Sequence, residues 1–282
     1  MTARRATRRG PWPALAMALA MALGAGAADA QGLNLGAGRS DQPIEITADN
    51  GIEWQQEALV FLARGNAKAV RGEVTVLADE LRAYYREEKT GGNEIWRLDA
   101  IGNVRIKTAT ETAFGKQAIY QVDLGVLVLT GGKVRLVTRT DEITADKQLE
   151  YWENKQMAVA RGNAFAVREN KRLKADVLAA YFKPDKAGDS KLYRVDAFDK
   201  VTIVTDKDTA TSERGVYNVE SGIATLTGSV QLTRGENVLN GCRAVVNLNT
   251  GVSNLYSCPA TGAAPRERAR GVLMPNTRKK EQ

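Results

Sequence analysis

Hydrophobic and polar residues alternate with a period of two along most of the chain after residue 40. The segments 44–48 and 104–107 show this alternation clearly. Because successive side chains of a β-strand point to opposite faces of a sheet, the pattern predicts strands with one apolar and one polar face, which is typical of antiparallel sheets. Turn residues such as those at 49–51, 123–125 and 249–251 separate the strands. The sequence therefore predicts an all-β protein.

Two copies of one pattern follow each other at a fixed offset of 97 residues. Residues 46–85 align with residues 143–182 without a gap, and 18 of the 40 positions are identical. The same register continues to Gly131 in the first copy and to Gly228 in the second. An offset that holds over this length indicates a tandem duplication, with repeat copies at about 46–131 and 143–228.

A smaller unit recurs inside each copy and opens on a glycine or an aspartate. The polar segments 86–94 and 183–190 lie inside the longest units, and we expect both to form exposed turns. A unit of two or three strands cannot bury its apolar face alone, so neighbouring units must stack around a shared interior. Glycine at an opening permits a sharp corner where a strand passes from one sheet to the other. The openings are Gly65, Gly102, Gly131, Gly162, Asp199 and Gly228.

The two ends of such a stack expose strand edges. The region around Ile44 has no capping helix, and the polar segment after Pro259 is poorly suited to close the other end. Since unpaired edges recruit further strands, we expect association end to end, with itself or with proteins of the same shape. Terminal strands that are short or covered are the alternative.

The first 30 residues differ in character from the rest. Four arginines precede an apolar stretch from Trp12 to about Ala27, and small residues follow up to Ala30. This order predicts a secretory signal peptide over 1–30, cleaved before Gln31, and then a flexible segment over 31–40. An uncleaved membrane anchor is the alternative, although the apolar stretch is shorter than the roughly 20 residues that a spanning helix needs.

The formal charge of +7 is concentrated at the two termini. Residues 41–258 are close to neutral, which argues against a nucleic-acid groove, and we expect the basic segment 259–282 to be disordered. The chain has no histidine, so the commonest general base and metal ligand is missing. Asp79 and Asp176 occupy equivalent repeat positions, which favours a role in turns or strand edges over acid–base catalysis. We therefore expect no catalytic residues, no metal and no cofactor.

The chain contains two cysteines, Cys242 and Cys258. A hairpin centred on Thr250 places them opposite each other, at the cross-strand separation of about 4.5–5.5 Å that suits a disulfide. An exported protein meets oxidising conditions, so we expect a structural disulfide that closes the last hairpin. Metal binding or a redox pair is the alternative, and the absence of histidine and the wide spacing disfavour it.

Several short motifs resemble the OstA-like (LptA) family of lipopolysaccharide-transport proteins. They are DQPIEITAD from Asp41, the recurrent RGNA and IGNV, and LVLTG before a further strand. The resemblance is clearest over 41–151 and extends to about Ser257. It implies an elongated, twisted, open β-jelly roll over 41–258 whose apolar interior holds the acyl chains of lipopolysaccharide. It also implies a periplasmic location and head-to-tail contacts with itself and with inner-membrane and outer-membrane components of a transport bridge.

The resemblance carries lipid contacts onto particular residues. The expected contacts are Ile44 and Ile46 after the DQP segment, Ile106, Tyr120 and Val122 on later interior strands, and Arg86 near the lipid phosphates. For Arg86 a solvated turn is the alternative. The implied function is a non-enzymatic bridge that carries lipopolysaccharide from the inner to the outer membrane. An exported structural β-polymer, a membrane-anchored component of the same pathway and a carbohydrate-active enzyme are the alternatives.

Overall fold

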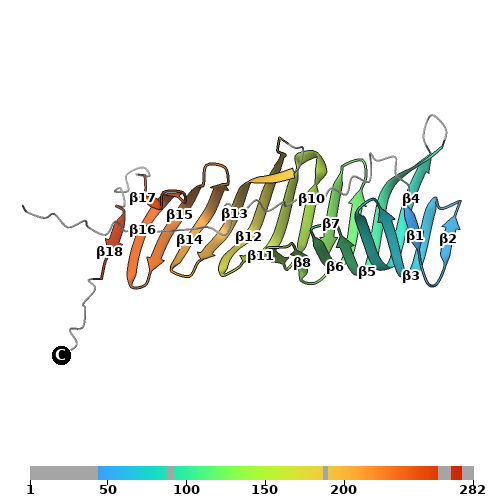
Figure 1. Ribbon diagram of the computed structural model, residues 1–282, viewed down its shortest axis with the longest axis horizontal. Coiled ribbons are helices and arrows are strands. Elements are labelled where there is room, and N and C mark those ends of the chain that lie inside the picture. The colour runs from blue at the N-terminus through green and yellow to red at the C-terminus, as the bar shows by residue number, and fades with distance from the viewer. Residues whose placement is uncertain (1–43, 88–91, 187–189, 260–267, 275–282) are drawn as a thin grey trace, which may run out of the picture.

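The computed structural model consists almost entirely of β-strands, which confirms the all-β prediction. Figure 1 shows the strands side by side in one long row, with β2 at one end and β18 at the other. Within the described residues no helix has the length and apolarity to cross a membrane. The predicted signal peptide and the segment 31–40 lie outside the described residues, which are 44–87, 92–186, 190–259 and 268–274.

The strands are mostly long, and one short 3-10 helix separates two of them. In the first half of the chain they are β1 (Glu45–Thr47), β2 (Ile52–Gln55), β3 (Val60–Arg71), β4 (Val74–Glu87), β5 (Asn93–Lys107), β6 (Thr112–Gln121), β7 (Val126–Thr130), β8 (Val134–Val137), β9 (Asp141–Ala145) and β10 (Gln148–Trp152). After the 3-10 helix η1 (Glu153–Lys155) they are β11 (Met157–Arg168), β12 (Lys171–Pro184), β13 (Ser190–Val204), β14 (Asp208–Asn218), β15 (Ile223–Arg234), β16 (Asn237–Asn247), β17 (Val252–Tyr256) and β18 (Arg270–Val272).

All 18 strands belong to one antiparallel sheet that folds along its length into two half-sheets. The ten strands β3–β6 and β11–β16 run through both halves. Four pairs of short strands contribute one member to each half: β2, β7, β10 and β17 to the first half-sheet, and β1, β8, β9 and β18 to the second. The described sheet therefore has fourteen rungs. One buried cluster takes residues from both halves, so the half-sheets share an interior, as in the predicted jelly roll.

The six predicted unit openings are the corners at which the sheet folds. Each opening residue has a positive φ, between 61° and 94°, and the residue after it has a positive φ as well, between 44° and 71°. Where such a pair lies inside a strand, it faces one residue of a neighbouring strand, and the pairing register shifts there. Two residues opposite one form a β-bulge, which bends the strand and increases its twist. The prediction that these positions form strand corners is confirmed.

Each corner lies close to the side chain that faces it from the next rung. A Cβ atom built on Gly102 would lie 2.1 Å from the Asp79 Oδ2 atom, so the close approach as well as the positive φ requires glycine. The Asp79 carboxylate accepts hydrogen bonds from the Asn103 side-chain amide at 2.9 and 3.1 Å. In the second copy Asp176 accepts from the Lys200 ammonium at 3.1 Å. Both aspartates therefore hold corners, as the repeat predicted.

The last hairpin contains the predicted disulfide but not the predicted register. Cys242 and Cys258 are bonded, with their Cα atoms 4.8 Å apart. Asn247 pairs with Val252, so the register centred on Thr250 is wrong by one residue. The reason is the Asn247 side chain, which accepts hydrogen bonds from the backbone N–H groups of Asn249 and Thr250 at 3.0 and 3.1 Å. This arrangement builds a four-residue turn where the symmetric hairpin needed three.

The segment 259–282 was predicted to be disordered, but its described residues include one strand. Arg270–Val272 forms β18 and pairs with Val238–Asn240 of β16. The Asn237 side chain adds a hydrogen bond from the Met274 backbone N–H at 2.8 Å. Because β17 covers only the other half of β16, this short strand pairs backbone groups that would otherwise face solvent. The prediction is wrong for these residues.

Replacing Gly102 with alanine tests whether the corners need glycine. We expect Gly102→Ala to lower the free energy of unfolding by about 2–4 kcal/mol, since the new Cβ adds a clash with Asp79 to the cost of a positive φ. Urea unfolding followed by circular dichroism measures the difference.

Gly235→Ala is the matched control. Gly235 has a φ of +54° and nothing within 4 Å of a built Cβ atom, so only the backbone cost of about 1–2 kcal/mol applies. Equal losses in the two variants would show that the approach of Asp79 does not constrain the corner.

Candidate functional site

The shared interior is the candidate site, because it is apolar along the whole row of strands. One cluster of buried residues runs from Ala63 in β3 to Val246 in β16. Many of its members are alanine, valine or leucine, and partly buried residues from Ile46 to Leu255 pack against it. A sheet with one apolar face thus lines a long internal surface, as the period of two requires.

A cavity of about 960 Å³ lies in this interior, and residues of both repeat copies, from Glu111 to Asn249, line it. Its volume is at the upper end of the range of about 300–1,000 Å³ in which proteins bind small molecules. Both half-sheets contribute to its wall, and some charged residues belong to its lining. The apolar wall includes Leu127, Leu129, Ile143, Leu149, Leu173 and Val195.

Three turns with the sequence Thr-x-x-acid lie at the margin of the second half-sheet, at 108–111, 138–141 and 205–208. In each turn the threonine hydroxyl accepts a hydrogen bond from the backbone N–H of the acidic residue, at 2.9 to 3.2 Å. The threonine N–H in turn donates to the carbonyl oxygen of the acidic residue, at 2.9 to 3.0 Å. The turn therefore fixes the position of each acidic residue.

Two of the three acidic residues form ion pairs with an arginine that faces them on the neighbouring strand. Asp141 accepts two hydrogen bonds from the Arg168 guanidinium at 2.5 and 2.6 Å, and Asp208 accepts two from Arg234 at 2.5 and 2.7 Å. These bidentate pairs neutralise the carboxylates at the edge of an apolar interior. Their role is to hold neighbouring strands together where the half-sheet ends.

Glu111, the third acidic residue, has no arginine in the equivalent position. Thr112 pairs with Val137 in an antiparallel register, so the residue that faces Glu111 is Thr138. Glu111 is 7% exposed and lines the cavity. Burial, together with the negative charge of Asp141, raises the pKa of the Glu111 carboxyl to about 7. The cavity therefore contains a carboxyl group that changes its charge near neutral pH.

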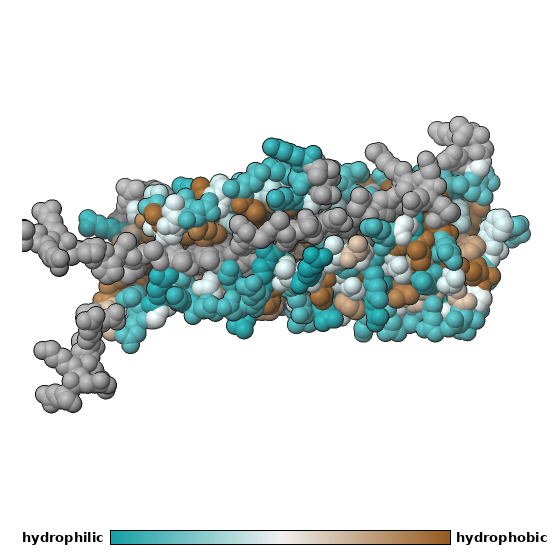
Figure 2. All heavy atoms as spheres, viewed as in Figure 1, coloured by the Kyte–Doolittle hydropathy of each residue, from teal (hydrophilic) through white to brown (hydrophobic). Residues whose placement is uncertain are grey.

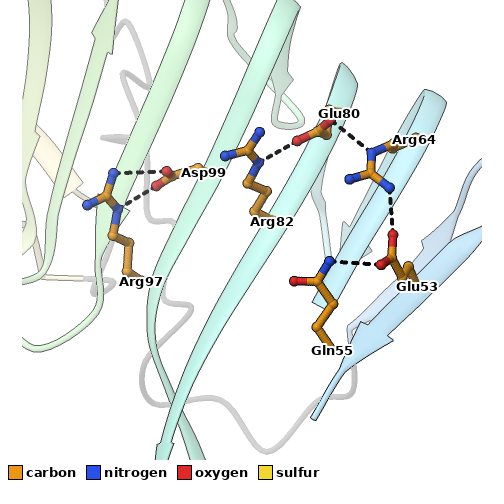
Figure 3. Close-up of polar contacts among 7 residues, drawn as sticks. All are labelled: Glu53, Gln55, Arg64, Glu80, Arg82, Arg97 and Asp99. Carbon is orange, nitrogen blue, oxygen red and sulfur yellow. Dashed lines mark hydrogen bonds and ion pairs between the residues drawn. The ribbon is translucent and has the colours of Figure 1, made fainter. Parts of the chain in front are cut away.

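The outer face of the first half-sheet is polar and carries a ladder of ion pairs (Figure 3). Arg64 donates to Glu53 at 2.7 Å and to Glu80 at 3.2 Å, and Arg82 donates to Glu80 as well. Arg97 and Asp99 form a further pair. Arg64 of β3 thus links β2 to β4, whereas the pairs Arg82–Glu80 and Arg97–Asp99 each lie within one strand. Exposed pairs of this kind stabilise a protein by about 0–1 kcal/mol each.

The interior brings most of the predicted lipid contacts together. Ile106 is 1% exposed and Tyr120 is 5% exposed, and both belong to the buried cluster. Ile46 and Val122 are partly buried and pack against the same cluster. Ile44 is half-buried just before β1. Contact of these five residues with lipid stays a prediction.

Tyr120 is fixed by a polar contact inside the apolar cluster. Its hydroxyl donates a hydrogen bond to the Glu153 Oε2 atom at 2.9 Å. Burial raises the pKa of the Tyr120 phenol, and the neighbouring Glu153 carboxyl raises it further. The phenol therefore stays protonated, with its ring directed into the interior cluster and its hydroxyl engaged.

Arg86 lies away from the buried cluster, on the exposed end of β4. Its guanidinium binds Glu94 at 2.9 and 3.1 Å and Asp123 at 2.7 and 2.9 Å. Two carboxylates therefore compete with any phosphate for this cation. Its contact with lipid phosphates stays a prediction, which these ion pairs disfavour.

Glu111, Arg168 and Arg234 were not among the residues predicted from the sequence. The recurrent Thr-x-x-acid signal was present in the sequence, and an arginine follows two of the acidic residues by 26 or 27 positions. Their partnership depends on strand pairing, which the period of two does not reveal. Within the described residues no group of three or more potential ligands is placed to hold a metal ion.

Comparison with known proteins identifies the family. The model of the LptA/(LptD N-terminal domain) LPS transport protein family matches residues 45–147 and again residues 142–252. This chain belongs to that family. The two matches begin 97 residues apart, which equals the offset of the tandem duplication. Membership of the LptA/LptD N-terminal family thus extends over both repeat copies.

Two further similarities accompany the family match. An uncharacterized protein of Rhizobium meliloti (strain 1021) is 29% identical over 122 residues, which are 42% of this chain and 65% of the relative. The match therefore spans less than two thirds of that relative. The structure of LptH, the LptA homologous periplasmic component of the lipopolysaccharide transport device from Pseudomonas aeruginosa, matches 83% of this chain and 97% of its own, at 14% identity and a TM-score of 0.21.

The buried carboxyl gives the stability a predictable dependence on pH. Since Glu111 has a pKa of about 7 in the folded chain and an ordinary value of 4.5, the folded state holds more protons than the unfolded state between these values. Stability therefore falls as the pH rises from 4.5 to 7. We expect Glu111→Gln to remove this fall and to be more stable than the wild type by about 3 kcal/mol above neutral pH. Urea unfolding at several pH values measures it.

Glu142→Gln is the control, since Glu142 is an exposed neighbour of Asp141 on the same strand. It should leave the pH dependence unchanged. Parallel stability curves for the wild type and Glu111→Gln would contradict the assignment.

Proposed function

We propose that this chain is a periplasmic lipopolysaccharide-binding bridge that carries lipopolysaccharide from the inner to the outer membrane without catalysing a reaction. The observation that carries the proposal is the apolar interior, which continues across both repeat copies and contains a cavity of about 960 Å³. Membership of an LPS transport protein family supports the same conclusion.

The interior suits acyl chains on physical grounds. Each buried CH₂ group stabilises a bound chain by about 0.8 kcal/mol. Because the apolar lining continues from rung to rung, a chain that moves along it exchanges one apolar contact for another. Movement therefore costs little, but the interior supplies no direction. We propose that direction comes from a partner that uses energy from elsewhere.

The two ends suit contacts with further β-rich chains. At the first end Ile52 and Trp54 of β2 are 46% and 61% exposed, and Figure 2 shows apolar residues gathered at this end of the molecule. At the other end Tyr256, Val272 and Leu273 are exposed. Both ends are formed by short strands, and each of these strands pairs on one side only within the described residues. We propose that they bind a second copy of the chain, head to tail, and the inner-membrane and outer-membrane components of the bridge.

Ile46→Asp tests lipid binding in the interior. Ile46 packs against the buried cluster from β1, so a carboxylate there would face the acyl chains without a partner. We expect the variant to bind lipopolysaccharide about tenfold more weakly or worse. Titration of purified protein with fluorescent lipopolysaccharide measures the affinity.

Thr47→Asp is the matched control, because Thr47 is exposed on the opposite face of the same strand. It should bind like the wild type, and both variants should keep their strand content by circular dichroism. A wild-type chain that forms filaments but does not bind lipopolysaccharide would favour a structural β-polymer instead.

A further inference from the structure

One pair of facing positions on neighbouring strands carries different charges in the two repeat copies. In the first copy Arg86 of β4 lies directly opposite Glu94 of β5 and forms an ion pair with it, and Asp123 binds the same guanidinium. This group contains one cation and two carboxylates. Its charges are satisfied within the protein.

The equivalent positions of the second copy lie 97 residues further on, and there two cations face each other. Lys183 of β12 lies directly opposite Lys191 of β13, and Glu220 occupies the position of Asp123. Like charges directly opposite each other destabilise a sheet. Glu220 forms an ion pair with Lys183 at 2.6 Å, whereas in the described part of the chain no carboxylate lies within ion-pair distance of Lys191. Among the described residues, Lys191 therefore forms no ion pair that balances its charge.

Both lysines belong to the lining of the apolar cavity. Lys183, Lys191 and Glu220 line it together with the ring of Tyr193, which lies 5.4 Å from the Lys183 ammonium. The Lys183 side chain is 46% exposed, so its ammonium reaches solvent at the cavity opening. Lys186 and Asp185 belong to the same part of the lining, so three lysines and two carboxylates lie there and the rim has a net positive charge. An apolar pocket with such a rim is complementary to a molecule that joins apolar chains to an anionic group.

We propose that Lys183 and Lys191 bind a phosphate group of an acylated lipid whose chains occupy the cavity that these lysines line. The inference rests on the proposed function and places the lipid headgroup at one rung. A phosphate between the two ammonium groups would relieve their repulsion and form charge-assisted hydrogen bonds with both. The first copy lacks this site because Glu94 and Asp123 already occupy Arg86.

Lys191→Glu tests the site, because it restores the residue type of the first copy at this position. The variant should fold, since the new carboxylate would pair with Lys183 as Glu94 pairs with Arg86. We expect it to bind bisphosphorylated lipid A about tenfold more weakly, which corresponds to about 1.4 kcal/mol. The same lipid with both phosphates removed should bind the variant and the wild type within twofold. Fluorescence titration measures the affinities, and thermal unfolding checks the fold.

Two variants control for net charge and position. Lys174→Glu makes the same charge change at an exposed position of β12, outside the cavity lining, and should leave binding unchanged. Glu94→Lys creates the lysine-like arrangement in the first copy and should strengthen binding of the phosphorylated lipid only.

The outcomes separate this site from the proposed function. A wild type that binds neither lipid overturns both proposals. A wild type that binds lipid A while Lys191→Glu binds it equally well overturns this site alone, as would equal losses with the dephosphorylated lipid or with Lys174→Glu. Competition by inorganic phosphate at millimolar concentration would show a site for the free anion and would overturn the assignment to a lipid.

Discussion

The whole fold depends on a backbone conformation that most residues resist. A sheet encloses an interior by folding lengthwise only when every long strand bends at the same height. Here alternate long strands, from β3 to β15, bend through two consecutive positive φ angles, and a side chain from a neighbouring strand packs against the glycine of each glycine corner. Glycine at five of the six corners meets both requirements. The corners are therefore aligned by stacking of one rung on the next, and a misplaced corner would disturb its neighbours on both sides.

Much of this architecture follows from the sequence, because local and repeated signals encode it. The period of two gave the faces of the strands, and the offset of 97 residues gave the equivalence of the corners. Details that depend on a single side chain were not accessible. Asn247 shifts the last hairpin by one residue through its own turn hydrogen bonds, and β18 forms only because half of β16 is otherwise unpaired.

The candidate site likewise contains some residues that the sequence identifies and others that it does not. Ile46 and Ile106 are identified as interior residues by alternation within their own strands, so the sequence was sufficient for them. Glu111 has a raised pKa because of its surroundings on neighbouring strands. Thr138 faces it, where the two related turns have an arginine. A pairwise property of this kind needs the register of strands that are distant in sequence, and the same holds for Lys183 and Lys191.

The tandem duplication has a consequence for reach. Six rungs, from β3 to the pair β9 and β10, form one repeat before β11 starts the next. Since neighbouring strands lie about 4.8 Å apart, one repeat lengthens the molecule by roughly 29 Å while its cross-section stays the same. The length of the molecule therefore changes in steps of one repeat. A gene could adjust the distance that one chain spans by gaining or losing whole copies, without redesigning the lining that each copy encloses.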